Sequence, residues 1–143
     1  MGTLETLVGM EKEYQYFEDL FIWNTSMQMC YRIYEAMANC KDYGLRNQME
    51  KSAVSIPSNI SEGYELGSDK GFIRHLHISK GSCAELRTQL YIAVNRKYIS
   101  AEQGDQLIDQ AKKISSMIQL FIAERRKRML KNVIKSIISF IFW

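Results

Sequence analysis

The sequence predicts an all-α protein, folded as an up-down-up-down four-helix bundle with an N-terminal arm and a C-terminal extension. In four separate segments, apolar residues recur at alternating spacings of three and four, the pattern of a helix with one buried face. Short runs of turn-forming residues separate these segments, and short connections favour antiparallel neighbours. The 143 residues suffice for one domain with a hydrophobic core. We divide the chain into an arm (1–16), a bundle (17–128) and an extension (129–143).

The first helix is expected over about residues 19–39, after an arm that shows no firm period. Asp19 has a side chain able to cap its N-terminus. Its apolar stripe follows spacings typical of a core-facing helix. The stripe consists of Leu20, Trp23, Met27, Cys30, Tyr34 and Met37.

The second helix is expected over about residues 45–64 and contains the only proline, Pro57. Its stripe runs from Met49 through the proline to Ile60, although a proline inside a helix costs roughly 3 kcal/mol. Nearby polar side chains can bond the backbone groups that the proline leaves unpaired. Two interpretations stay open, a kinked core helix or a surface shaped for a partner. The residues of this motif are Ser55, Pro57, Ser58, Asn59, Glu62 and Gly63.

The third helix is expected from Ser68 or Asp69 to about Tyr98, with two neighbouring apolar stripes. The first stripe contains Phe72, Leu76, Ser79, Cys83, Leu86, Leu90 and Ala93. The second contains Ile73, Ala84, Tyr91 and Val94. An apolar surface this wide indicates a helix that touches two neighbours or one that faces another subunit.

The fourth helix is expected over about residues 101–128, and Ser100 with Gln103 forms a capping box at its start. The extension that follows combines the basic run 125–128 with a mostly apolar segment. Such a segment can be a membrane-surface helix, additional packing within an oligomer, or an extension unrelated to the bundle. We do not expect a membrane partner, and no segment is apolar for long enough to span a bilayer.

Charge is distributed unevenly along the chain, which hints at an anionic partner. The net charge of +3 divides into −5 over residues 1–68, +4 over 69–98, −2 over 99–124 and +6 over 125–143. We therefore expect phosphate contacts from the third helix, at Lys70, Arg74, Lys80, Arg87, Arg96 and Lys97. The alternative is a solvated basic face. Because no sequence-reading module is present, binding should depend on backbone charge or on shape.

No catalytic or metal-binding pattern is evident. His75 and His77 are two residues apart and point to different sides of a helix. The three cysteines lack metal-like spacing and fit a reducing, cytoplasmic compartment. We expect a non-enzymatic protein with no metal and no cofactor.

Several short motifs occur in order over residues 16–125. They are Phe17-Glu18-Asp19-Leu20 with Trp23, Tyr43-Gly44-Leu45, Ser55-Ile56-Pro57-Ser58-Asn59-Ile60, Glu62-Gly63, Phe72 with Leu76, Gly81-Ser82, Ala84-Glu85-Leu86, Thr88-Gln89-Leu90 and Tyr98-Ile99. Together they resemble the four-helix bundle proteins encoded in intervening sequences of bacterial large-subunit rRNA genes. More distantly, the chain is similar to the accessory variability determinant proteins of diversity-generating retroelements.

The resemblance implies a homo-oligomer, with a ring-like pentamer favoured. The retroelement proteins join a reverse transcriptase and bind structured nucleic acid, which implies a nucleic-acid-binding accessory factor here. The alternative is a protein-interaction scaffold without nucleic-acid binding, such as an adaptor for a reverse transcriptase. Its surface would centre on Pro57 and Tyr64.

Overall fold

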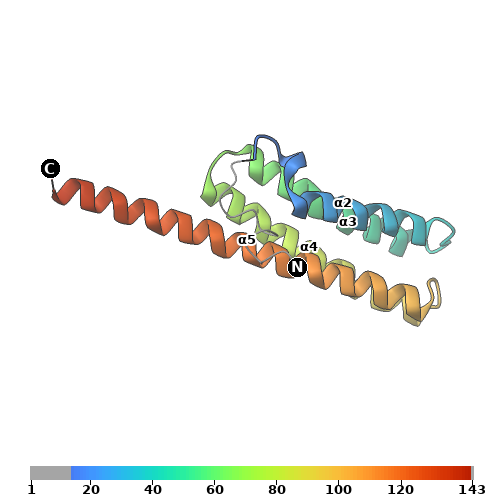
Figure 1. Ribbon diagram of the computed structural model, residues 1–143. Coiled ribbons are helices and arrows are strands. Elements are labelled where there is room, and N and C mark those ends of the chain that lie inside the picture. Colours follow the sequence, from blue (N-terminus) through green and yellow to red (C-terminus); the bar gives the residue numbers. More distant parts are fainter. Residues whose placement is uncertain (1–13, 143) are drawn as a thin grey trace.

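The computed structural model describes residues 14–142 as a four-helix bundle in which one helix extends beyond the others (Figure 1). A short 3₁₀ turn, η1 (Phe17–Asp19), leads into the helices. These are α2 (Phe21–Met37), α3 (Tyr43–Glu65), α4 (Asp69–Asn95) and α5 (Ala101–Ile141). Each helix packs on the next in the chain, and α5 closes the bundle against α2. The predicted fold class is therefore confirmed. Most of the predicted arm lies outside the described residues.

The core lies between two layers, α2 with α3 and α4 with α5 (Figure 1). Every helix contributes large apolar side chains that are fully buried, as the heptad-like stripes predict. They include Ile22, Met29, Ile33, Met49, Ile56, Ile60, Leu76, Leu86, Leu90 and Leu107. On α4 the second stripe divides: Ile73 and Val94 pack against the core, whereas Tyr91 is exposed. The helix contacts two neighbours, α3 and α5.

Side-chain caps begin three of the helices. Asp42, Ser68 and Ser100 each accept a hydrogen bond from the backbone N–H three residues later. The predicted capping role of Asp19 was wrong, because Leu20 occupies the N-cap position of α2. The Asp19 carboxylate instead accepts a hydrogen bond from the backbone N–H of Tyr16 and stabilises η1.

The predicted buried stripe of α2 was partly wrong. Cys30 and Met37 are buried as expected, but Tyr34 is 44% exposed and Trp23 is only partly buried. The most deeply buried line of the helix lies one residue away, at Ile22, Ser26, Met29 and Ile33. Both lines have helical spacing, so periodicity alone could not choose between them.

Helix α5 is longer than predicted. It was expected to end near residue 128, yet it continues to Ile141 without interruption, so most of the extension is helical. Figure 1 shows this part, orange to red, extending past the ends of the other helices. Whether residues 129–143 form a separate unit stays a prediction.

Helices α3 and α4 approach closely at Gly63. A Cβ atom built on Gly63 would lie 2.6 Å from Cβ of His75 and 3.1 Å from Cδ2 of Phe72. The first of these atoms is fixed to the α4 backbone and cannot rotate away. A side chain at residue 63 would therefore push the two helices apart.

We expect Gly63→Ala to destabilise the bundle by about 1–3 kcal/mol, because the added methyl group overpacks the contact with α4. Gly81→Ala is the matched control, since a Cβ there meets nothing within 4 Å. It should stabilise the protein by about 0.5–1 kcal/mol through the lower entropy of its unfolded chain. Urea denaturation measures both. Equal effects of the two substitutions would contradict the close approach at Gly63.

Candidate nucleic-acid interface

The two layers of the bundle differ in charge. Residues 69–128, which form α4 and the packed part of α5, contain twelve Lys and Arg residues against six Asp and Glu. Residues 17–66, which form η1, α2 and α3, contain four Lys and Arg residues against seven Asp and Glu. The electrostatic potential is therefore more positive on the α4–α5 layer than on the α2–α3 layer.

The six basic residues predicted from the sequence do not form one patch. Lys70 and Arg74 are exposed in the first turns of α4. Arg96 and Lys97 are exposed at its other end, about 40 Å away along the helix axis. The set is therefore divided between the two ends of the bundle.

The remaining two, Lys80 and Arg87, lie on the side of α4 that faces α5. The ammonium group of Lys80 donates a hydrogen bond to Oε1 of Gln119. Arg87 is partly buried, and its Nε atom is buried without a hydrogen-bond partner in the described structure. The Arg87 side chain is thus less open to a phosphate than the exposed lysines are.

Helix α5 adds cations to the same side of the molecule. Nη2 of Arg126 lies 3.2 Å from Nε2 of His77, which joins α5 to α4 beside the exposed Lys127. Lys112 is also exposed and precedes Arg126 by 14 residues, or about four helical turns, so it lies on the same side of α5. We define the basic face as Lys70, Lys80, Lys112, Arg126 and Lys127. The sequence indicated the charge near 125–128 but not its position beside α4.

Two arginines of the basic run are instead bound to one carboxylate. Nη1 of Arg125 lies 3.1 Å, and Nη2 of Arg128 2.6 Å, from Oδ1 of Asp69. The Arg125 guanidinium also stacks 5.0 Å from the ring centre of Phe72, in the core. Burial opposes ionisation of Asp69, but hydrogen bonds from Arg128 and Arg125 outweigh it and lower the pKa of this carboxyl. These contacts join the start of α4 to α5 where the bundle ends.

The proline motif lies mainly at the contact between α3 and α4. Pro57 and Gly63 are buried, and the hydroxyls of Ser55 and Ser82 are 2.8 Å apart across the two helices. Asn59 donates to the carbonyl of Ser55, and its Oδ1 lies 3.0 Å from Nδ1 of His75. Only Ser58 and Glu62 of the motif are exposed. These contacts favour the structural interpretation of the motif.

The cysteines are buried single thiols. Burial raises the pKa of the Cys83 thiol to about 12, although the nearby Arg87 opposes this shift. Burial, with a smaller contribution from Glu50, also raises the pKa of Cys30. Both thiols therefore stay protonated and weakly nucleophilic at neutral pH.

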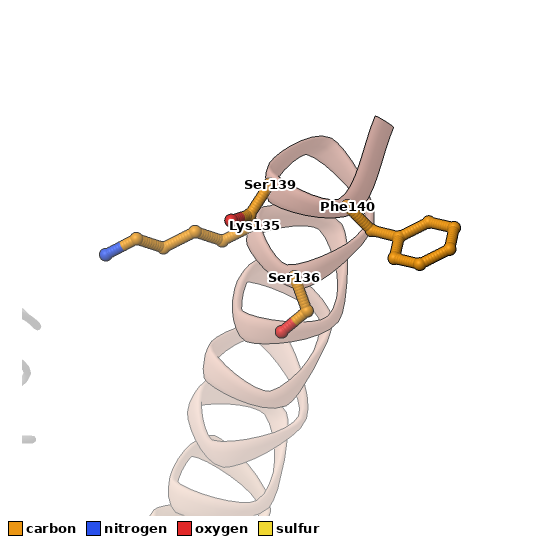
Figure 2. Close-up of a pocket in the computed structure, with 4 residues that line it drawn as sticks. All are labelled: Lys135, Ser136, Ser139 and Phe140. Carbon is orange, nitrogen blue, oxygen red and sulfur yellow. The ribbon is translucent and has the colours of Figure 1, made fainter. Parts of the chain in front are cut away.

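Within residues 14–142, no group of three His, Cys, Asp or Glu side chains could hold a metal ion. A surface depression is lined by Lys135, Ser136, Ser139 and Phe140, and Figure 2 shows these four side chains on the last turns of α5. It is too open to enclose a substrate.

Comparisons with known proteins agree with the fold. The family model described as "23S rRNA-intervening sequence protein" matches residues 18–120. A crystal structure of a protein of unknown function from the S23 ribosomal protein family of Bacteroides thetaiotaomicron is 25% identical to this chain. The match covers 71% of this chain and 97% of that one, with a TM-score of 0.67. No curated protein matches the chain.

We expect acid to weaken the bundle through Asp69. Because the folded pKa of Asp69 is lowered, its ionised carboxyl stabilises the fold above the unfolded pKa of about 3.9. This stabilisation is lost as the pH falls through the folded pKa. At neutral pH, Asp69→Asn should lower the free energy of unfolding by about 1–3 kcal/mol, and the variant should lose less further stability below pH 4.

The control is Asp109→Asn, which removes a carboxylate that is 67% exposed and 3.6 Å from Lys112. It should change stability by less than about 0.5 kcal/mol. Urea denaturation at a series of pH values provides the measurement. If the free energy of unfolding of Asp69→Asn depended on pH in the same way as that of the unmodified protein, a stabilising role for the Asp69 carboxylate would be excluded.

Proposed function

Since the chain belongs to the 23S rRNA-intervening sequence protein family, we propose that it is a non-enzymatic accessory protein that binds structured RNA or DNA. The observation that carries this proposal is the separation of charge between the layers of the bundle. The α4–α5 layer has a surplus of basic residues, and the α2–α3 layer has a surplus of acidic ones. The protein would thus present one preferred side to a polyanion.

The chemistry of the basic face indicates how nucleic acid would be bound. Lys70, Lys112 and Lys127 have exposed ammonium groups, which suit contacts to phosphate oxygens. Two neighbouring amides of α5, Gln106 and Gln110, face α2 and accept hydrogen bonds from Arg32, so they point away from the basic face and are not placed to read bases there. Binding would follow backbone charge and shape, with little dependence on base sequence.

We further propose that the protein acts in the cytoplasm as a homo-oligomer, with a pentamer favoured. An oligomer presents several copies of the basic face at once. Linked copies bind a long polyanion more tightly than one copy does, without any new type of contact.

An exposed aromatic surface on α2 favours a second candidate function, a protein-interaction scaffold such as an adaptor for a reverse transcriptase. Tyr31 and Tyr34 are 52% and 44% exposed, beside the partly buried Met27. Pro57 and Tyr64 do not provide such a surface, since Pro57 is buried and Tyr64 packs edge-on against Phe72. A partner bound through α2 would contact the acidic layer, opposite the basic face.

We expect the full-length protein to bind structured RNA and duplex DNA with an affinity that falls steeply with salt. Replacing Lys70 and Lys127 by Gln should lower the slope of log K against log salt by about two, because two phosphate contacts are lost. Both side chains are exposed, so the fold should not change. Electrophoretic retention over a salt series measures the slope.

The matched control replaces Lys41 and Lys51, two exposed lysines before and in α3, by Gln. It changes the net charge equally but leaves the basic face intact, so the slope should stay close to that of the unmodified protein. An intact oligomer that retains no nucleic acid at low salt would reject the proposal in favour of the scaffold. Tyr31→Ser with Tyr34→Ser would then test the α2 surface against a candidate protein partner.

A further inference from the structure

The end of α5 has an apolar face that the bundle does not cover. We define the tail helix as residues 129–141, which follow the last contact with Asp69. Six of its aliphatic side chains are 48–66% exposed, and Phe140 is 87% exposed. The six are Leu130, Val133, Ile134, Ile137, Ile138 and Ile141. A contiguous exposed surface of this kind marks an interaction site.

The spacing along α5 shows which way this face points. Gln119, Arg126 and Val133 are seven residues apart and therefore lie on one line of the helix. Gln119 and Arg126 contact Lys80 and His77 of α4. The apolar face continues this line past the start of α4, about 110° around the helix from the face that α5 buries in the core.

The apolar face also points away from the other layer of the bundle. Helix α2 approaches α5 at Gln106 and Gln110, whose side chains accept hydrogen bonds from Arg32. These two positions lie on the opposite side of α5 from Leu130 and Ile137. A flat surface can therefore touch the tail helix and the basic face together, without meeting α2 or α3.

The charge of this segment specifies the partner. Residues 125–143 contain six Lys and Arg residues and no Asp or Glu. Lys131 and Lys135 lie to the side of the apolar face, and Figure 2 shows Lys135 and Phe140 projecting from different sides of the helix. Lysines on one side with aliphatic and aromatic residues on the other are typical of helices that lie in the interface of an anionic bilayer.

Two other arrangements, a membrane-spanning tail helix and a contact between two tail helices, fit less well. The tail helix is only about 20 Å long, which is shorter than a hydrocarbon core of about 30 Å. No described helix is long and apolar enough to cross a membrane. Two tail helices packed together would cover only about 200 Å² on each copy, or about 400 Å² in total, whereas stable interfaces bury a total of about 1,200–2,000 Å². Such a contact would also bring the cations of two copies together, because residues 125–143 contain no Asp or Glu to pair with them.

We propose that the tail helix binds the surface of an anionic membrane, with its apolar face at the boundary between headgroups and acyl chains. Arg126, Lys127, Lys131 and Lys135 would lie near lipid phosphates. The sequence alone did not favour a membrane partner, because it did not show that the bundle leaves this face exposed and turned toward its basic side. This proposal is independent of nucleic-acid binding.

The test is sedimentation of the full-length, nucleic-acid-free protein with phosphatidylcholine vesicles, with and without phosphatidylglycerol. The protein should sediment with the anionic vesicles, and salt should weaken this binding. Ile134→Asn with Ile137→Asn removes two apolar groups from the exposed face and should weaken binding at least about tenfold. Because both side chains are about half exposed, the bundle should stay folded.

The matched control is Ser136→Asn with Ser139→Asn, which introduces the same residue twice on the polar side of the same turns. It should bind like the unmodified protein. The proposal is overturned if the unmodified protein does not sediment with anionic vesicles, or if both double variants bind equally. It is also overturned if the Ile variant changes only the oligomer mass, which would make the tail helix a contact between copies.

Discussion

The close packing of α3 on α4 is the contact on which the other parts of the structure depend. It combines a missing side chain at Gly63 with hydrogen bonds that a purely apolar seam would lack. Ser79 is fully buried and donates to the carbonyl of Ile56, directly before the proline. Buried polar groups tolerate little sliding, because each displaced donor or acceptor would be left without a partner. This seam fixes the position of the α2–α3 layer relative to the α4–α5 layer, which carries the basic face.

The distribution of charge depends on the pairing of α4 with α5. Asp69 pairs with Arg125, which is mostly buried, and with Arg128, which is about half exposed. Other surface cations, such as Lys70 and Lys127, form no ion pair within the described residues 14–142. Outside this cluster, residues 69–128 still contain ten Lys and Arg residues against five Asp and Glu, although the chain as a whole carries only +3.

Much of the fold could be predicted from sequence, because four apolar stripes, the capping side chains of Ser68 and Ser100 and short turns all indicate the same topology. The buried side of α2 could not be predicted, because the residue lines through Trp23 and through Ile22 are both largely apolar. Only the packing of the helices determines which line is buried. The end of α5 could not be predicted either, because the apolar residues move to another side of the helix near residue 128 although the helix continues to Ile141. For the candidate interface, the sequence identified cations on α4. It missed Lys112 and Arg126, because their position beside α4 depends on how two helices pair.

Because α5 is one continuous helix, it forms a stiff rod that connects the core to the end of the described chain. The helix is about 60 Å long, and from Asp105 to Ile141 it contains neither glycine nor proline, the residues at which helices usually bend. One part of this rod is embedded in the core and the other projects from it. A force or torque applied at Phe140 would reach Ile118 without a hinge to absorb it. Whatever holds the end of the chain would thereby set the orientation of the whole bundle.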